Sequence, residues 1–204
     1  MGSEADPSNG YERIAAEFLA GRGRAPSTGI GARAVREWAS ALPHGATVID
    51  VGCGSGIPIT RELVNQGFNV YAVDASPSMV SAFRRNFPKT PVACESVQDS
   101  LFFIRRFDAV LSWGLMFLLQ PEQQHHLIQR FSDILVPGGR LLFTSESKPV
   151  VWNDAMTGLE SRSLGAEEYT KLLSAVGLSV IREYEDEGEN HYFEAVKNET
   201  NTVW

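Results

Sequence analysis

DVGCGSGIP, residues 50–58, is the stretch that decides the fold of this chain. A short apolar run, Thr-Val-Ile at 47–49, precedes it, and a run with helical character, 59–66, follows it. This order predicts a strand, a tight turn and a helix start, because glycine permits both the turn and the close approach of a ligand. The spacing is G-x-G-x-G, and Ile57 stands where a dinucleotide fingerprint needs glycine. The loop predicts a nucleotide-like ligand other than a nicotinamide or flavin cofactor, with a turn that binds no ligand as the alternative.

A carboxylate stands at the end of the next apolar run. Residues 69–73 predict a second strand, and Asp74 follows at its tip. An acidic side chain in this place, about twenty residues past a glycine loop, can accept hydrogen bonds from both ribose hydroxyls of an adenosine. The alternative is an aspartate that caps a helix or shapes a turn. Ser76 at the N-cap and Pro77 at the first helical position already start the next helix well, so we expect Asp74 to be available for a ligand.

Four stretches occur in order along the chain: DVGCGSG (50–56), VYAVDASPSMV (70–80), FDAVLSWGLMFLL (107–119) and LVPGGRLLFTS (135–145). Together they resemble the class I S-adenosylmethionine-dependent methyltransferase family, over roughly residues 10–197. The resemblance implies S-adenosyl-L-methionine as the cofactor. It also implies a three-layer α/β, Rossmann-like fold with a seven-stranded, mostly parallel sheet whose antiparallel C-terminal strand lies beside the fifth. The family methylates acceptors of many kinds, so the resemblance does not identify the substrate.

The pattern of apolar runs indicates the same architecture. Strand-like and helix-like segments alternate, which is typical of parallel strands joined by crossover helices. The strands are nearly continuous apolar runs, as expected for a sheet covered on both faces. At the end of the chain, two strands joined by a polar turn predict an antiparallel hairpin. We expect strands at 47–51, 69–73, 91–94, 107–112, 140–144, 179–184 and 191–196, and helices at 11–19, 32–42, 58–66, 77–86, 121–135 and 166–176.

Length and composition predict one domain at 11–204, with a disordered segment at 1–10, N-terminal lid helices at 11–42 and a core at 47–197. The net charge of −7 disfavours nucleic acid as a partner, because such binding depends on Lys and Arg. Two cysteines without metal-site or disulfide spacing suit a reducing cytosol. Neither a signal peptide nor a membrane-spanning run is expected. We therefore expect a cytoplasmic protein with no membrane partner, and the oligomeric state stays open.

The resemblance assigns cofactor contacts to the glycine loop and the second strand. Asp50 is expected to hold the methionine end of the cofactor. Gly52 and Gly54 allow the backbone to approach it, and Cys53 contacts it through its backbone. Asp74 is expected to bind the ribose.

Further cofactor contacts are expected past the later strands. Ala75 and Met79 are assigned to the adenine ring. Glu95 and Ser96, after the third strand, are assigned to the adenine amino group, although the family commonly has Asp where this chain has Glu95. The remaining expected cofactor contacts are Ser112, past the fourth strand, and Tyr11, in a lid helix over the cofactor.

The acceptor is expected near the fourth and fifth strands. Trp113 is expected to border it, with core packing as the alternative. Segment 144–163 is a long connection of polar and aromatic residues at the carboxyl edge of the sheet, where ligands bind in such folds. We interpret this segment as the substrate wall, formed by Glu146, Trp152 and Arg162. An ordinary surface excursion is the alternative.

No residue is assigned as catalytic, and no set of metal ligands is visible in the sequence. His125 and His126 point away from the apolar face of their predicted helix, so we expect them to be exposed to solvent. His44 precedes the first strand, at the wrong edge of the sheet for a base. His191 opens the last strand, where a structural role is expected.

These observations predict an enzyme that transfers a methyl group from S-adenosylmethionine to a small-molecule acceptor. The expected reaction is a metal-independent, in-line displacement that depends on alignment of the reacting atoms. The alternatives are a protein or peptide methyltransferase, and a catalytically inactive module that binds S-adenosylmethionine. A dehydrogenase is disfavoured by Ile57.

Overall fold

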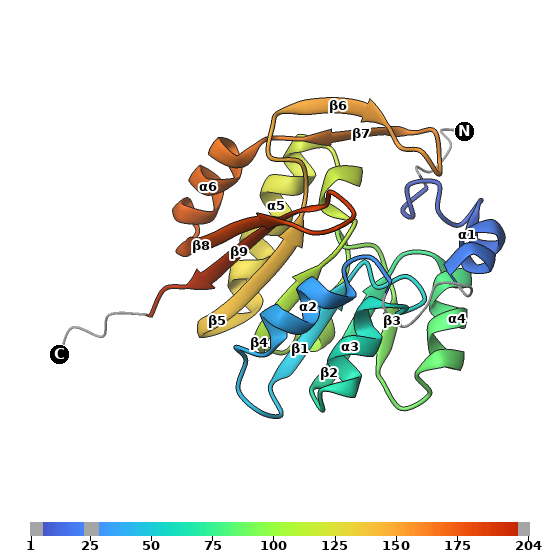
Figure 1. Cartoon of the computed structure of the whole chain (residues 1–204), viewed down its shortest axis with the longest axis horizontal. Helices are drawn as coiled ribbons and strands as arrows, with labels where there is room; N and C mark the ends of the chain where they lie inside the picture. The colour runs from blue at the N-terminus through green and yellow to red at the C-terminus, as the bar shows by residue number, and fades with distance from the viewer. Residues whose placement is uncertain (1–5, 23–28, 200–204) are drawn as a thin grey trace.

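A computed structural model describes residues 6–22 and 29–199, so the expected disordered segment 1–10 is described only from residue 6. Its centre is a seven-stranded sheet in the order β3-β2-β1-β4-β5-β9-β8 (Figure 1). Strands β1 to β5 are parallel, and β9 runs antiparallel between β5 and β8. The predicted sheet, including its antiparallel strand beside the fifth, is confirmed. The strands are β1 (Thr47–Val51), β2 (Asn69–Asp74), β3 (Val92–Cys94), β4 (Phe107–Ser112), β5 (Leu135–Thr144), β8 (Leu178–Glu185) and β9 (His191–Lys197).

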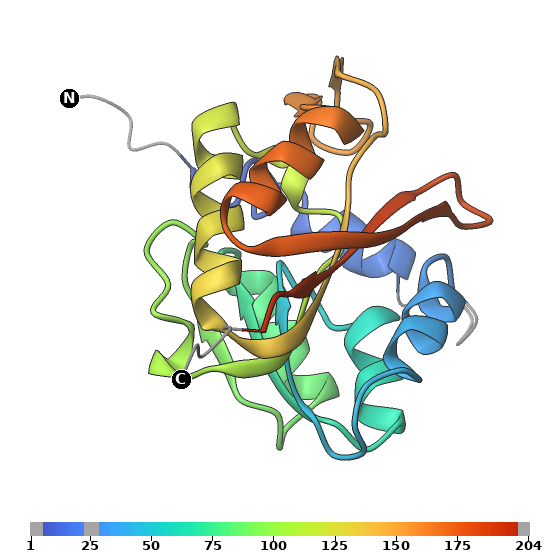
Figure 2. The ribbon, with the colours of Figure 1, turned by 90° about the vertical axis from the view of Figure 1, so that its left-hand side faces the viewer.

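Helices cover both faces of the sheet and complete three layers (Figure 2). One face carries α2 (Ala32–Ala39), α3 (Ile59–Asn65) and α4 (Pro77–Asn86). The other face carries α5 (Pro121–Ile134) and α6 (Ala166–Ala175). The three-layer α/β fold expected from the alternation of segments is therefore present.

Two neighbouring residues of β1 show why both faces must be covered. Val48 belongs to the apolar cluster under α2 and α3, whereas Ile49 belongs to the cluster under α5. Both side chains are fully buried. Because successive side chains of a strand point to opposite faces, a continuous apolar run requires a helix layer on each side. Two 3₁₀ helices, η1 (Phe102–Ile104) and η2 (Met116–Leu118), flank β4.

The N-terminal segment differs from the helix predicted at 11–19. Residues 7–14 form turns, and α1 (Ala15–Arg22) begins only after them. The carboxylate of Asp6 supports the first of these turns, since it accepts hydrogen bonds from the backbone N–H of Ser8 at 2.9 Å and from its hydroxyl at 2.6 Å. Local side-chain bonds of this kind compete with helix formation. The helical spacing therefore predicts the helix but places its start too early.

The connection after β5 contains a second, two-stranded sheet that the sequence pattern did not predict. β6 (Val150–Asn153) pairs antiparallel with β7 (Glu160–Ser163). Asp154 shapes the turn between them, because its Oδ1 accepts hydrogen bonds from the backbone N–H of Thr157 at 2.7 Å and of Met156 at 3.0 Å. Strands of four residues are too short to show a clear alternation. Figure 1 shows this hairpin and α1 at the same end of the sheet.

Candidate active site

A cavity of about 800 Å³ opens at the carboxyl ends of the parallel strands. This volume lies within the range of small-molecule sites, ~300–1,000 Å³. The ends of β1, β2 and β4 line it, which is the edge where ligands bind in open α/β sheets. The N-terminal segment, the turn of the β6–β7 hairpin and the tip of the β8–β9 hairpin contribute to its walls.

The glycine loop lines this cavity and is tied to β2. The Val73 carbonyl accepts hydrogen bonds from the backbone N–H of Gly52 at 2.8 Å and of Cys53 at 3.1 Å. Gly56 has a φ of +78°, and a Cβ there would lie 2.4 Å from an aromatic ring carbon, so packing requires glycine. Gly54 differs, because nothing lies within 4 Å of the place where a Cβ would stand. The backbone at Gly54 is therefore open to a ligand.

Asp74 organises the loop and also lines the cavity. Its Oδ2 accepts a hydrogen bond from the backbone N–H of Gly54, and its Oδ1 accepts one from the backbone N–H of Ser76, each at 2.8 Å. The bond to Ser76 means that Asp74 does shape the turn, which was the alternative to a ligand contact. Asp74 nevertheless also lines the cavity, so it can have both roles. Each carboxylate oxygen has two lone pairs, so both oxygens keep acceptor capacity for a ligand. Burial raises the pKa of Asp74.

Asp50 lies at the base of the loop and is 1% exposed. Its Oδ2 accepts a hydrogen bond from the Thr60 hydroxyl at 2.5 Å. Burial raises the pKa of Asp50 to about 7, and the nearby charge of Asp74 acts in the same direction. A bound cation would favour the ionised carboxylate and offset this effect. Burial also raises the pKa of the Cys53 thiol, so that group stays protonated and is unsuited to nucleophilic attack.

The residues assigned to the adenine lie partly inside and partly outside the cavity lining. Ala75 and Met79 line the cavity. Glu95 is exposed and lies outside the lining. The Ser96 hydroxyl also lies outside it and bonds within its own turn. Val97, one position further along the chain, lines the cavity instead.

Tyr11 lines the cavity from the N-terminal turns, and its hydroxyl donates to Asp154 Oδ2 at 3.4 Å. The adjacent Glu12 binds the start of α4. Its Oε1 accepts the Ser78 hydroxyl at 2.7 Å, and its Oε2 accepts the Ser78 backbone N–H at 3.0 Å and the Ser76 hydroxyl. These bonds from Ser76 and Ser78 lower the pKa of Glu12. They place a negative charge at the N-terminus of α4, where the helix dipole favours it.

The wall opposite the glycine loop is mostly apolar. Trp113 lines it, whereas Ser112 is fully buried and lies outside the lining. Phe117 of η2 also lines the cavity. Trp152 lies outside the lining and contacts Phe117, with ring centroids 5.5 Å apart. Met156, in the turn of the same hairpin as Trp152, reaches the cavity.

Two residues expected in the substrate wall lie outside the cavity lining. Glu146 is exposed to solvent. Arg162 forms an ion pair with Glu160, and its backbone carbonyl accepts a hydrogen bond from Gln124 Nε2 at 3.1 Å. The roles assigned to Glu146 and Arg162 stay predictions. Arg162 could affect the cavity only indirectly, through the position of the β6–β7 hairpin on which it lies.

Known proteins share this architecture. Residues 48–139 match the family model described as a methyltransferase domain. An aklanonic acid methyltransferase of a Streptomyces species is 31% identical over 147 residues, which cover 68% of this chain and 60% of that protein. This chain belongs to the class I S-adenosylmethionine-dependent methyltransferase family. A ribosomal RNA small subunit methyltransferase C of Chromohalobacter salexigens is 34% identical over 110 residues, which cover 52% of this chain and 33% of that protein.

This chain thus spans less than two thirds of the length of these curated relatives. A solved structure of the 1,6-didemethyltoxoflavin-N1-methyltransferase of Burkholderia thailandensis superposes with a TM-score of 0.69. The two chains are 20% identical, and the match covers 98% of this chain and 93% of the other. At this level of identity the match shows a shared fold.

Several residues that line the cavity could not be predicted from the sequence. Ile30 and Leu115 line it, and no motif marks either of them as a ligand contact. Gly188 and Asn190 also line it, from a polar segment that predicts a turn and nothing more. Glu12 was missed as well, because its partners on α4 are more than sixty residues away in the chain.

The histidines of this chain do not supply a base at the cavity. His125 and His126 are exposed on α5, as predicted. Within 6–22 and 29–199, no histidine lines the cavity, and no group of three or more His, Cys, Asp or Glu side chains is placed to hold a metal ion. In the same described ranges, no helix has the length and apolar character needed to cross a bilayer.

Proposed function

We propose that this chain transfers a methyl group from S-adenosylmethionine to a small-molecule acceptor by in-line displacement, without a metal. The observation that carries the proposal is the open backbone at Gly54, which lines the same cavity as the carboxylates of Asp50 and Asp74. Together these groups offer close approach, hydrogen-bond acceptors and negative charge. A cofactor with ribose hydroxyls and a positively charged α-amino group matches that combination.

The residues at the cavity fit the parts of the cofactor one by one. Asp50 is a buried carboxylate that a positively charged amino group would stabilise in its ionised form. Gly54 leaves room beside the loop, and Asp74 keeps acceptor capacity for the ribose hydroxyls. Ala75 and Met79 offer apolar surface for the adenine ring.

S-adenosylmethionine supplies a methyl group on a sulfonium, so the protein has mainly to align the acceptor with it and exclude water. Tyr11 and Phe18 of the N-terminal segment line the cavity and support its closure. No histidine or lysine is found among the described lining residues. We therefore propose no general base, and an acceptor atom that is nucleophilic without one fits this site.

A small-molecule acceptor is supported by the size and chemistry of the cavity. Its volume of about 800 Å³ suits a cofactor with a compact second ligand. Leu115, Phe117 and Met156 give the acceptor side an apolar surface. The aklanonic acid methyltransferase supports the same class by its name. The ribosomal RNA methyltransferase points to RNA, but a net charge of −7 opposes binding to a phosphate backbone.

Calorimetry and a labelled-methyl screen test this function. S-adenosylmethionine and S-adenosylhomocysteine are expected to bind, and nicotinamide dinucleotides are not. Transfer of labelled methyl is then sought with panels of metabolites and peptides, and metabolite turnover is the expected result. Turnover of peptides alone would favour the protein methyltransferase. Binding without any turnover would favour the inactive module, and no binding of either S-adenosyl compound would refute the cofactor assignment.

A further inference from the structure

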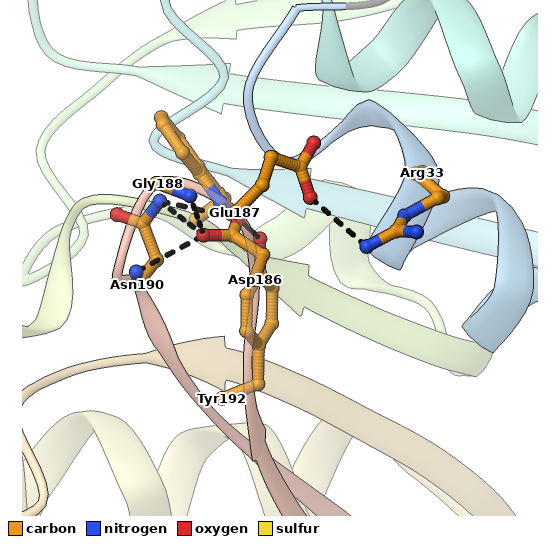
Figure 3. Close-up of polar contacts among 7 residues, drawn as sticks. Arg33, Asp186, Glu187, Gly188, Asn190 and Tyr192 are labelled. Atoms are coloured by element: carbon orange, nitrogen blue, oxygen red, sulfur yellow. Dashed lines mark hydrogen bonds and ion pairs between the residues drawn. The ribbon is translucent and has the colours of Figure 1, made fainter.

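The tip of the β8–β9 hairpin is organised around the carboxylate of Asp186 (Figure 3). Its Oδ1 accepts hydrogen bonds from the backbone N–H of Gly188 at 2.9 Å and of Asn190 at 3.0 Å. Its Oδ2 accepts the hydroxyl of Tyr192 at 2.7 Å. Gly188 and Asn190 both line the cavity. A single carboxylate therefore determines the shape of one cavity wall.

The same tip is fixed against the start of α2. Gly188 lies so close to Ile30 that a Cβ on the glycine would be 2.4 Å from the Ile30 side chain. Glu187 adds an ion pair with Arg33 at 3.3 Å, although both side chains are largely exposed. Exposed pairs contribute little free energy. Close packing at Gly188, more than the ion pair, holds the tip in place.

The side chain of Asn190 has one orientation that suits Asp186. Its amide nitrogen donates to both carboxylate oxygens of Asp186, at 2.9 and 3.1 Å. A carboxylate only accepts hydrogen bonds, so the amide must turn its nitrogen toward Asp186 and its oxygen away. Figure 3 shows this arrangement. Within the described ranges, no group donates a hydrogen bond to that oxygen, and Asn190 itself lines the cavity.

Asp186 also orients the indole of Trp113. Tyr192 is fully buried, and its hydroxyl donates to Asp186 while it accepts the indole N–H of Trp113 at 2.8 Å. Burial and the bond to Asp186 raise the pKa of Tyr192, so the phenol keeps the proton that it donates. Gly31 also packs closely against the indole, since a Cβ there would lie 2.8 Å from the indole nitrogen. The indole therefore has a fixed position beside the cavity.

We propose that Asn190 and Trp113 together recognise the methyl acceptor, as a flat apolar ring that carries an N–H or O–H group. The inference rests on the proposed function and narrows its substrate class. The indole of Trp113 provides a flat apolar surface for the ring. The oxygen of Asn190 provides an acceptor for the donor group on the ring. Asp186 and Tyr192 are positioning residues, because they act only by orienting Asn190 and Trp113.

The orientation of the Asn190 amide favours ligands with a hydrogen-bond donor over ligands that lack one. The amide nitrogen of Asn190 is committed to Asp186, so the side chain cannot turn over to serve an acceptor group. A ligand that covers the amide oxygen with a methyl group leaves it desolvated and unpaired. Sites built in this way discriminate against analogues that lack the hydrogen-bonding group.

The test compares pairs of ring compounds that differ only in the donor group. β-Naphthol is paired with β-methylnaphthalene, and para-toluidine with para-xylene, since a methyl group has nearly the size of a hydroxyl or amino group. Titration with S-adenosylhomocysteine comes first and reports on the proposed function alone. Dissociation constants for the four probes are then measured by NMR on the full chain saturated with S-adenosylhomocysteine.

The native protein is expected to favour the donor member of each pair by roughly five- to tenfold, the effect of about one hydrogen bond. Asn190→Ala should remove this preference, while S-adenosylhomocysteine binds as before. Tyr192→Phe should weaken the binding of both members of a pair to the same extent. It removes the hydrogen bond that orients the indole of Trp113, while the bonds between Asn190 and Asp186 remain. Asn65→Ala, a change at an exposed position of α3, is the matched control and should keep the preference.

The results distinguish failure of the proposed function from failure of the recognition site. Absence of S-adenosylhomocysteine binding would refute the proposed function itself. With that ligand bound, a native protein that shows no donor preference, or no binding of any probe, would overturn the recognition site. A preference that persists in a folded Asn190→Ala protein, judged by its far-UV circular dichroism and thermal midpoint, would overturn it as well.

Discussion

The two sides of the cavity are built in different ways. The side proposed to hold the cofactor comes from the continuous stretch 50–58 and from Asp74, which parallel pairing of β1 and β2 places beside it. The side proposed to hold the acceptor combines Trp113, Met156 and Asn190 from three separate parts of the chain. On the cofactor side, backbone groups and glycines determine the shape of the site. On the acceptor side, side chains and the residues packed against them determine it.

This difference indicates how each side will respond to substitution. A change at the glycine loop or Asp74 alters hydrogen bonds to the backbone and is expected to act on the cofactor. A change on the acceptor side alters the position of one side chain and leaves the loop in place. Substitutions at sites that share no segment contribute additively to the measured free energies, whereas substitutions at coupled sites do not. Four measurements test whether the two sides are independent.

The largest effect is expected from Asp74→Ala. The substitution removes the proposed ribose contact and the bond to the Gly54 N–H, and should cost about 1.5–3 kcal/mol, or roughly ten- to a hundredfold in affinity for S-adenosylmethionine. Calorimetry measures it. Asp108→Ala is the matched control, because Asp108 also accepts a backbone N–H, that of Thr47 at 2.8 Å, but lies outside the cavity lining. Equal affinities in both variants would remove Asp74 from the site.

Asp50 should make cofactor affinity depend on pH. Its pKa of about 7 means that the carboxyl is mostly protonated below pH 7 and ionised above it. A cationic ligand binds the ionised form, so affinity should rise with pH and fall by up to about tenfold per pH unit below 7. Asp50→Asn should flatten this profile. Calorimetry in buffers of different ionisation enthalpy should show proton release near pH 6, and its absence would contradict the assignment.

Trp152→Ala should act on the acceptor side alone. Loss of the ring contact with Phe117 is expected to raise the KM for the acceptor by roughly three- to tenfold, the scale of one aromatic pair. Cofactor affinity should stay within about threefold. Val151→Ala, one residue earlier on the same strand and exposed, is the control. Arg162→Ala should behave as Trp152→Ala does, and a loss of cofactor binding in either variant would break the division into two sides.

The smallest effect is expected from removal of metal ions. Turnover of whatever acceptor is found should be unchanged after treatment with EDTA and desalting, because the proposed displacement requires alignment and no Lewis acid. Initial rates before and after treatment give the answer. Activity that is lost and then restored by magnesium would reveal a ligand set on one side of the cavity.

The segments that could be predicted from the sequence are those whose backbone conformation depends on residues close to one another in the chain. The glycines and the apolar runs place β1, the loop and β2, since backbone conformation and burial on both faces follow from those residue types. The β6–β7 hairpin could not be predicted, because its strands are short and its turn depends on Asp154. Asn190 could not be recognised as a cavity residue for a related reason. Its place depends on the bonds to Asp186 and on the packing of Gly188 against Ile30, and neither contact leaves a pattern in the chain.

The N-terminal turns give the two sides of the cavity a common element. Glu12 binds Ser78 at the cofactor side, while the next residue, Arg13, donates to the Thr157 carbonyl of the β6–β7 turn at 2.9 Å. Two successive residues supply these bonds, so the N-terminal turns connect the two sides of the cavity. A ligand that stabilises one end of this bridge thereby favours the other end, and such coupling is reciprocal by thermodynamic necessity. Cofactor and acceptor are thus expected to bind with positive cooperativity, through a segment of the chain that precedes the first helix.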